Sequence, residues 1–140
     1  AGDDGHAARA HLLEHGTVHT NLSVDKLLMY QLMKLSLENR TIEYADNRIS
    51  LFSAQHGKCA ITLEEFQQAN EIHCHHKKPK HLGGTDDYFN LIILHKNVHK
   101  LIHAVNEETI SSYISLIKPD EEMLKKINIL RKQCGNTEIK

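Results

Sequence analysis

The stretch HCHHKKPKHLGGTDDYFNLIILHKNVHKLIH, residues 73–103, holds seven of the twelve histidines in this 140-residue chain. His99 and His103 are four residues apart in VHKLIH, so in a helix both rings project from one face, about one turn apart. That spacing lets two imidazoles grip one divalent cation. His95 extends the row, but it lies about 12 Å of helix from His103, so one ion is not expected to use both.

A two-histidine helix needs a third ligand, and the predicted strand EIHCHH (71–76) offers it. Successive side chains of a strand point to opposite sides, so His75 and His76 diverge and do not easily bind the same ion. One of them can complete the metal site, while the other flanks the substrate and takes a proton from water. Three protein ligands leave positions open for a phosphate oxygen and for water, as a catalytic metal site requires.

The loop between these two segments carries an Asn and a basic run. Asn90 lies at the loop-to-helix junction in FNLIIL, where its side chain can bond the backbone and pin the loop that carries the base. The run HHKKPKH (75–81) contains no acid, and residues 71–103 hold five Lys and three acids. This indicates a modest anion-facing patch, with a solvated loop as the alternative. The lysines expected to meet backbone phosphates are Lys77, Lys78, Lys80 and Lys100, with Lys96 assisting.

Helical and strand-like patterns flank this stretch. A helix is expected to begin at Ser23 and cover VDKLLMYQLMKLSLEN (24–39), and a second covers ADNRISLFSAQ (45–55) from Asp46 or Asn47. KCAIT (58–62) and NEIHCHH (70–76) read as a hairpin, and NLIILHKNVHKLIHAV (90–105) returns to helical spacing. Pro119 ends a helix over 107–118, and Asp120 caps a last one, EEMLKKINILRKQ (121–133), which stops at Gly135.

Composition excludes several classes of protein. The chain is 40% hydrophobic and 25% charged with a formal net charge of −1, which suggests one soluble globular domain. This balance argues against coating nucleic acid by bulk electrostatics. We expect neither a spanning helix nor a signal peptide. Three widely spaced Cys form no disulfide framework, which favours a reducing compartment. His11, His15 and His19 step by four, but no carboxylate or Cys completes a site there.

The central stretch resembles the HNH, or ββα-metal, nuclease motif. The double His of the motif matches His75 and His76, its central Asn matches Asn90, and its closing pair matches His99 and His103. The closing-pair spacing is similar to that in colicin-type DNases. YADNRISLFSAQHGKCAIT (44–62) and VHKLIHAVNEETI (98–110) are more similar to the C-terminal endonuclease domain of group II intron-encoded reverse transcriptases, or maturases.

The resemblance implies an α+β fold, a ββα-metal core of a β-hairpin and a helix around one metal ion, with flanking α-helices. His76 would be the general base and Asn90 would orient it. His75, His99 and His103 would hold one divalent ion, Mg²⁺ or Mn²⁺, with Zn²⁺ or Ni²⁺ as crystal substitutes. The ion would stabilise the departing 3′ oxygen, leaving a 5′ phosphate.

The resemblance also implies an organisation and a setting. Residues 1–42 would be an N-terminal segment with one helix, a connector or the edge of a larger parent chain. Residues 43–118 would be the endonuclease domain, and residues 119–140 a C-terminal helix packed on it. The protein would nick one DNA strand in group II intron mobility, where the new 3′ end primes reverse transcription. Its partners would be DNA and, through a larger parent protein, intron RNA and the reverse transcriptase, with no membrane. The location would be cytoplasmic, with nucleoid-associated activity of bacterial type, or organellar.

The sequence departs from this pattern at a zinc site. Many relatives carry two CxxC pairs that bind a structural zinc. Here Thr62 stands three residues after Cys59, where the first pair would have its second Cys, and His95 and Val98 stand in place of the second pair. A four-Cys zinc is therefore ruled out, and a residual site of Cys59 and His95 is a minor alternative. The remaining donors are interpreted as follows: His73 as a spare ligand or phosphate contact, Asp86 and Asp87 as loop caps rather than metal ligands, Cys74 as a small core residue, and Cys134 as unpaired and incidental.

Two other functions compete with nicking. In the first, the same histidines are a non-catalytic structural clamp in a nucleic-acid-binding module. A structural clamp favours a closed four-ligand site, usually with Cys, whereas this sequence offers three ligands and a spare base. The second alternative is a non-specific HNH nuclease. A nuclease toxin usually has strong positive charge, and the net charge of −1 counts against it.

Overall fold

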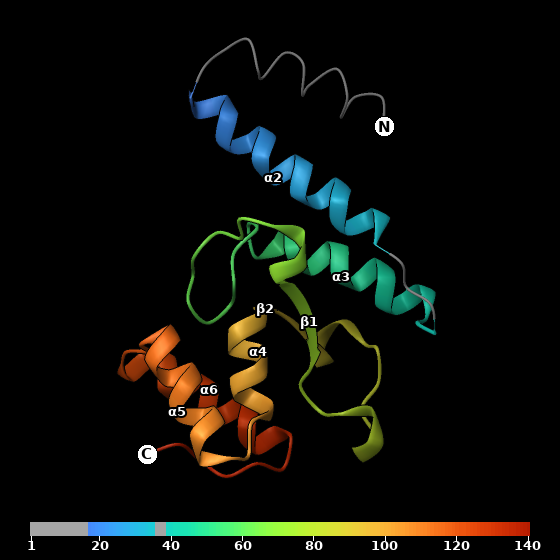
Figure 1. Cartoon of the computed structure of the whole chain (residues 1–140). Helices are drawn as coiled ribbons and strands as arrows, with labels where there is room; N and C mark the ends of the chain where they lie inside the picture. The colour runs from blue at the N-terminus through green and yellow to red at the C-terminus, as the bar shows by residue number, and fades with distance from the viewer. Residues whose placement is uncertain (1–16, 36–38) are drawn as a thin grey trace.

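The computed structural model describes residues 17–35 and 39–140, with side chains from residue 26 onward within these ranges. The helices and strands follow the order α2, α3, β1, β2, α4, α5, α6 (Figure 1). Their bounds are α2 Thr17–Lys34, α3 Ile42–Ala54, β1 Ile72–His76, β2 Leu91–His95, α4 Lys96–His103, α5 Glu107–Ile117 and α6 Glu121–Gln133. Short 3₁₀ turns cover Ala69–Glu71, Lys80–Leu82 and Tyr88–Asn90.

The two strands form one antiparallel sheet, and α4 follows β2 without a break. In the strand register His75 lies opposite Ile92 and His76 opposite Leu91. The strands contribute Leu91, Ile93 and Leu94 to the core, each at most 1% exposed. This strand–strand–helix unit with flanking helices confirms the predicted α+β, ββα-metal fold class.

The prediction was wrong about which segments pair in the sheet. Residues 91–95 form β2 rather than the start of a helix, and only 96–103 are helical. KCAIT does not form the partner strand, because its segment contributes only an isolated bridge between Lys58 and Glu65. A short apolar run such as LIIL fits a buried strand and a buried helix equally well. Residues 91–95 form a strand because pairing with β1 provides hydrogen-bond partners for the backbone N–H and C=O groups of both segments.

The N-terminal helices begin earlier than predicted. α2 begins at Thr17 rather than after Ser23, and α3 is capped by Thr41 rather than by Asp46 or Asn47. The Thr41 hydroxyl accepts the Tyr44 backbone N–H at 2.9 Å, which satisfies one of the free donors of the first turn. α2 lies across α3 at one end of the molecule (Figure 1). Our expectations for His11 and His15 lie outside the described residues, as does the side chain of His19.

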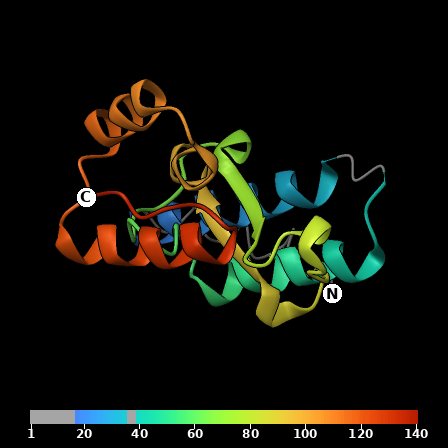
Figure 2. The same cartoon turned by 90° about the horizontal axis from the view of Figure 1, so that it is seen from below.

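The two C-terminal helices were predicted correctly. α5 ends at Ile117 before Pro119, and the Asp120 side chain caps α6 by accepting the Met123 backbone N–H at 2.8 Å. α6 packs against α4, and Figure 2 shows one end of α6 near the sheet. Arg131 of α6 is 1% exposed and donates to the Leu101 and Ala104 carbonyls at 2.6 and 2.8 Å, which fixes α6 against the end of α4.

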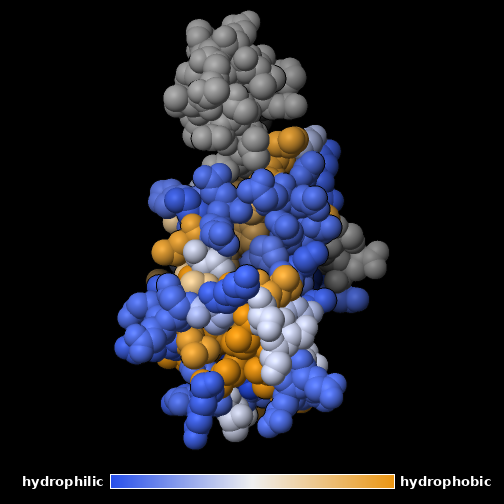
Figure 3. Space-filling view, turned by 60° about the vertical axis from the view of Figure 1, so that its left-hand side comes forward, coloured by the Kyte–Doolittle hydropathy of each residue, from blue (hydrophilic) through white to orange (hydrophobic). Residues whose placement is uncertain are grey.

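The core lies between the sheet, α4 and the helices on either side. One face of the molecule also carries an apolar patch among hydrophilic residues (Figure 3). Among the residues that the structure describes, every helix is too short or too polar to cross a bilayer.

Candidate active site

Three histidine rings meet where β1 packs against α4. The ring centroids of His75 and His99 are 5.0 Å apart, those of His75 and His103 also 5.0 Å, and those of His99 and His103 4.9 Å. His75 is 1% exposed, whereas His103 is exposed, so the cluster opens toward solvent on one side. The His-x-x-x-His spacing on α4 and the strand position of His75 thus converge as the sequence predicted.

The cluster keeps its histidines neutral. Burial, followed by the charges of His99 and His103, lowers the pKa of His75 to about 3. Burial also lowers the pKa of His99 to about 4, with smaller contributions from its histidine neighbours. A neutral imidazole carries a ring lone pair that can bind a metal. Neutral rings of this kind are suitable donors for a divalent cation. Among the described residues, however, the group whose ligand atoms all converge is His75, His103 and Cys134, and His99 is not part of it.

Two more donors border the cluster. The Nδ1 atoms of His73 and His99 are 2.9 Å apart, so His73 extends the cluster as a spare ligand would. The thiol Sγ of Cys134, at the end of α6, lies 3.7 Å from Nε2 of His75. Ligand atoms of His75, His103 and Cys134 all lie within 4.8 Å of one another. Cys134 is therefore not the incidental residue that its place in the sequence suggested.

His76 lies on the other side of β1, away from the cluster. Its Nε2 is 2.7 Å from Oδ1 of Asp86, and its ring stacks on Tyr44 with centroids 5.5 Å apart and planes 15° apart. The Tyr44 hydroxyl donates to the Cys74 carbonyl at 3.3 Å, which ties the stacking ring to β1. The strand alternation has separated the two adjacent imidazoles, as predicted.

Asp86 contacts His76 directly, whereas its place in the sequence suggested a loop cap, with a metal ligand as the alternative. It is 5% exposed, and its second oxygen accepts bonds from the Thr41 hydroxyl at 2.7 Å and from Lys80 at 3.0 Å. Burial alone would raise the pKa of Asp86, but hydrogen bonds from His76, Thr41 and Lys80 hold it well below its usual range. Asp86 is therefore a carboxylate that can only accept a hydrogen bond from His76.

Asn90 pins the loop, as its position at the junction predicted. Its side-chain oxygen accepts the Lys78 backbone N–H at 2.9 Å, and its amide donates to the carbonyls of Lys78 and Thr85 at 3.1 and 2.8 Å. These bonds join both ends of the segment that runs from the strand to Asp86. They act on the backbone beside His76 rather than on the His76 ring.

The lysines predicted to contact phosphate differ in their exposure and in whether they form an ion pair. Lys78 and Lys100 are exposed, and Lys77 is half-buried next to His76. Lys80 is exposed as well, but its ammonium group forms an ion pair with Asp86. Lys80 therefore also helps to hold the partner of His76, a role that the basic run did not reveal.

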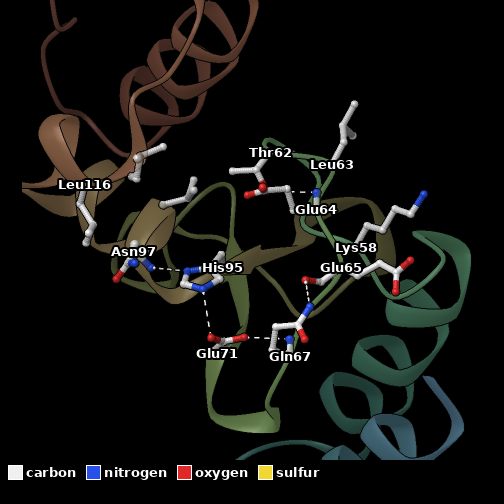
Figure 4. Close-up of a pocket in the computed structure, with 12 residues that line it drawn as sticks. Lys58, Thr62, Leu63, Glu64, Glu65, Gln67, Glu71, His95, Asn97 and Leu116 are labelled. Carbon is white, nitrogen blue, oxygen red and sulfur yellow. Dashed lines mark hydrogen bonds and ion pairs between the residues drawn. The ribbon is translucent and has the colours of Figure 1, made fainter. Parts of the chain in front are cut away.

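A cavity of about 570 Å³ is lined by His95 together with Thr62 and Val98, two of the positions at which the sequence was expected to lack zinc-binding cysteines (Figure 4). His95 lies 3.6 Å from the Glu71 carboxylate, and its Nδ1 accepts the Asn97 backbone N–H at 3.1 Å. His95 therefore caps α4 instead of pairing with the buried Cys59.

Comparison with known proteins agrees with this geometry. The family model described as HNH endonuclease matches residues 58–104, which contain both strands, the connecting loop and α4. No curated protein and no solved structure matches the chain. The family description indicates a metal-dependent nuclease, and therefore a hydrolase. The match covers about a third of the chain, and with the ββα arrangement it shows that residues 58–104 are similar to HNH endonucleases.

Proposed function

We propose that the protein is a metal-dependent DNA endonuclease that nicks one strand, with His76 as general base and His75, His99 and His103 as metal ligands. One observation carries the proposal. The neighbours His75 and His76 lie on opposite sides of β1, one within the three-histidine cluster and the other paired with a buried carboxylate.

Asp86 determines which nitrogen of His76 can act as the base. Because a carboxylate only accepts, Nε2 of His76 carries the proton in their 2.7 Å hydrogen bond. The lone pair of the neutral ring is then on Nδ1. Nδ1 accepts the proton of the attacking water, and the positive charge that forms on the ring is stabilised by Asp86. The stacked Tyr44 ring limits rotation of the imidazole.

The water oxygen forms a bond to phosphorus while the bond from phosphorus to the 3′ oxygen breaks. The departing 3′ oxygen takes a proton from solvent, which gives 3′-hydroxyl and 5′-phosphate ends. His75, His99 and His103 would hold the cation beside β1. When bound, that cation supplies positive charge for the phosphate and the leaving oxygen. The exposed side of His103 is where a phosphodiester would approach the cluster.

The basic residues would position the DNA backbone without reading its sequence. Lys77 and Lys78 follow His76 directly, and Lys100 lies on α4 between two ligands of the cluster. Lysine contacts to phosphate add affinity that falls with salt and carry no base information. Asn90 holds the loop that carries Lys78, so its contribution is to position both the loop lysines and Asp86.

The finer biological role rests on the sequence resemblance from residue 40 onward. In that role the nick occurs during group II intron mobility, and its 3′ end primes reverse transcription. Intron RNA and a reverse transcriptase would then be partners through a larger parent protein.

Cys134 favours a second candidate function, the structural metal clamp. A thiol beside the histidines could turn a three-ligand site into a closed one. The His76–Asp86 pair argues for catalysis instead, because a clamp has no use for an oriented base outside its ligand set.

A plasmid-nicking assay with and without Mg²⁺ or Mn²⁺ separates these candidates. We expect ion-dependent nicking by the wild type, loss of nicking in His76→Ala and near-normal nicking in His81→Ala, the exposed histidine of the same loop. Absence of nicking with every divalent ion would favour the clamp. Nicking by His76→Ala at the wild-type rate would refute the base assignment. Equal cutting of unrelated plasmids would identify a non-specific nuclease.

A further inference from the structure

We propose that Cys134 is a fourth protein ligand of the histidine cluster, which allows a thiophilic ion such as Zn²⁺ to close the site and block nicking. This inference rests on the proposed metal site and adds a regulatory property to it. It concerns a residue 59 positions from His75 in the chain, outside the residues matched by the family model.

The position of the thiol supports a ligand role. Sγ of Cys134 is 3.7 Å from Nε2 of His75, and it also lies 3.7 Å from the Lys77 carbonyl, next to the catalytic strand end. Bond lengths around zinc place two ligand atoms of one tetrahedron roughly 3.5 Å apart. The ligand atoms of His75, His103 and Cys134 all lie within 4.8 Å of one another. Because Cys134 faces Nε2 of His75 and His103 faces its Nδ1, side-chain rotation is needed to direct all three donors at one ion.

Hydrogen bonds to the end of α4 hold the C-terminal segment in the position that places Cys134 next to His75. Cys134 caps the C-terminus of α6, one turn after the buried Arg131, whose guanidinium group binds three carbonyls at the end of α4. The Asn136 side chain donates to the Ile102 carbonyl at 2.8 Å, so bonds on both sides of Cys134 reach the turn that carries His103. The thiol is therefore held beside the cluster by several independent contacts.

The chemistry of the donor atoms determines which ion binds more tightly when the thiol is a ligand. Mg²⁺ prefers oxygen ligands and gains little from a sulfur donor, whereas Zn²⁺ binds nitrogen and thiolate in a closed tetrahedron. His75, His103 and Cys134 would supply two nitrogens and one sulfur to such a tetrahedron. The neighbouring ring of His99 would supply the fourth donor after turning toward them, which would leave no position for a phosphate oxygen. The thiol gives its proton to solvent when it binds the ion. Zinc would thus compete with the nicking ion for the same histidines.

Cobalt replaces zinc in such sites and reports sulfur ligation by a near-ultraviolet charge-transfer band. We would titrate the full chain with Co²⁺ as wild type, Cys134→Ser and Cys74→Ala, the last as a control that removes a different free cysteine. We expect the band in the wild type and in Cys74→Ala and its loss in Cys134→Ser. Competition with Zn²⁺ should show at least about tenfold weaker binding in Cys134→Ser. Circular dichroism checks that each variant is folded.

Two outcomes overturn the inference: a wild-type spectrum without the thiolate band, or equal Zn²⁺ affinity in folded wild type and Cys134→Ser. Zinc inhibition of Mg²⁺-supported nicking gives an activity readout, and we expect Cys134→Ser to resist it. The spectra separate this inference from the proposed function. Nicking without the band removes the inference alone, whereas the band without nicking removes the proposed function alone.

Discussion

Two neighbouring residues, His75 and His76, have different surroundings because they lie on opposite sides of a strand. His75 is enclosed by other histidines, and burial with their charges lowers its pKa to about 3. His76 instead donates to Asp86, a carboxylate whose pKa is held low by three hydrogen bonds despite its burial. In the proposed function, the same side chain is therefore a metal ligand in one environment and an oriented base in the other.

Replacing Asp86 by Asn tests the orientation of the base. An Asn side chain can present its amide to Nε2 of His76, which favours the tautomer with the proton on Nδ1 and removes the lone pair that water needs. We expect Asp86→Asn to lower kcat for nicking by about 10- to 100-fold with KM for plasmid DNA nearly unchanged. Steady-state nicking kinetics measure both constants.

The control is Asp87→Asn, in the same loop, because the Asp87 side chain caps only the 3₁₀ turn at Phe89. Partial recovery in Asp86→Glu would support a positioning role, since a carboxylate is restored. A kcat for Asp86→Asn equal to that of the wild type would contradict it.

Sequence patterns predicted the residues whose partners are close in the chain. The four-residue step of His99 and His103 and the alternation at His75 and His76 follow from helix and strand periodicity. The proximity of Cys134 to His75 could not be predicted from periodicity, because only the packing of α6 against α4 brings the two residues together. Asp86 had a weak local signal, its place after two glycines in the loop, but a carboxylate there is also an ordinary turn cap.

At the scale of elements, β2 was the least predictable part of the fold. LIILH has the apolar character of a buried segment, and the helical pattern of the residues after it extends backward through it. Its strand identity comes from β1, which lies 15 residues earlier in the chain and supplies the register that places His75 toward α4. Helices with local caps, such as α6 after Asp120, were predictable because the cap is encoded beside them.

The loop between the strands gives a test of this element. A Cβ on Gly84 would lie 1.7 Å from the Lys78 carbonyl oxygen and 2.9 Å from that of Pro79. Because backbone atoms must move, we expect Gly84→Ala to lower the free energy of unfolding by more than about 2 kcal/mol. Urea unfolding monitored by circular dichroism measures this loss.

Gly83→Ala is the matched control. Gly83 has a φ of +95°, but a Cβ there meets only the flexible end of Lys78 at 3.6 Å. Its cost should be about 1 kcal/mol, from backbone strain alone. Equal losses in the two variants would show that the close approach at Gly84 does not limit stability.

Across the whole molecule, buried arginines join the flanking helices to one another and to α4. The buried Arg131 joins α6 to α4, and the buried Arg48 of α3 donates to the Leu32 carbonyl of α2 at 2.6 Å. Both are long-range contacts of the fold. The core and its metal cluster therefore depend on residues on either side of the matched segment.

The crowded histidines make stability depend on pH when no metal is bound. The pKa values of His75 and His99 fall from 6.5 to about 3 and about 4 on folding. Between pH 6.5 and about 4 the unfolded chain therefore binds more protons, and stability falls as the pH falls. The loss is at most about 1.4 kcal/mol per pH unit for each such histidine.

Urea unfolding in chelator at pH 7.5 and pH 5 should show this loss in the wild type. We expect His99→Gln to show a smaller loss and His81→Gln, at an exposed position, to behave as the wild type. Equal stability of the wild type at both pH values would mean that the cluster is not buried as described.

The most direct test of the central claim compares His75→Ala with His76→Ala in two assays on the same preparations. Mn²⁺ binding is measured by calorimetry, and nicking is measured on supercoiled plasmid with saturating ion. We predict that His75→Ala loses ion binding and nicking together, while His76→Ala binds the ion normally and does not nick. Loss of ion binding in His76→Ala, or normal ion binding in His75→Ala, would contradict the division of tasks between these two neighbours.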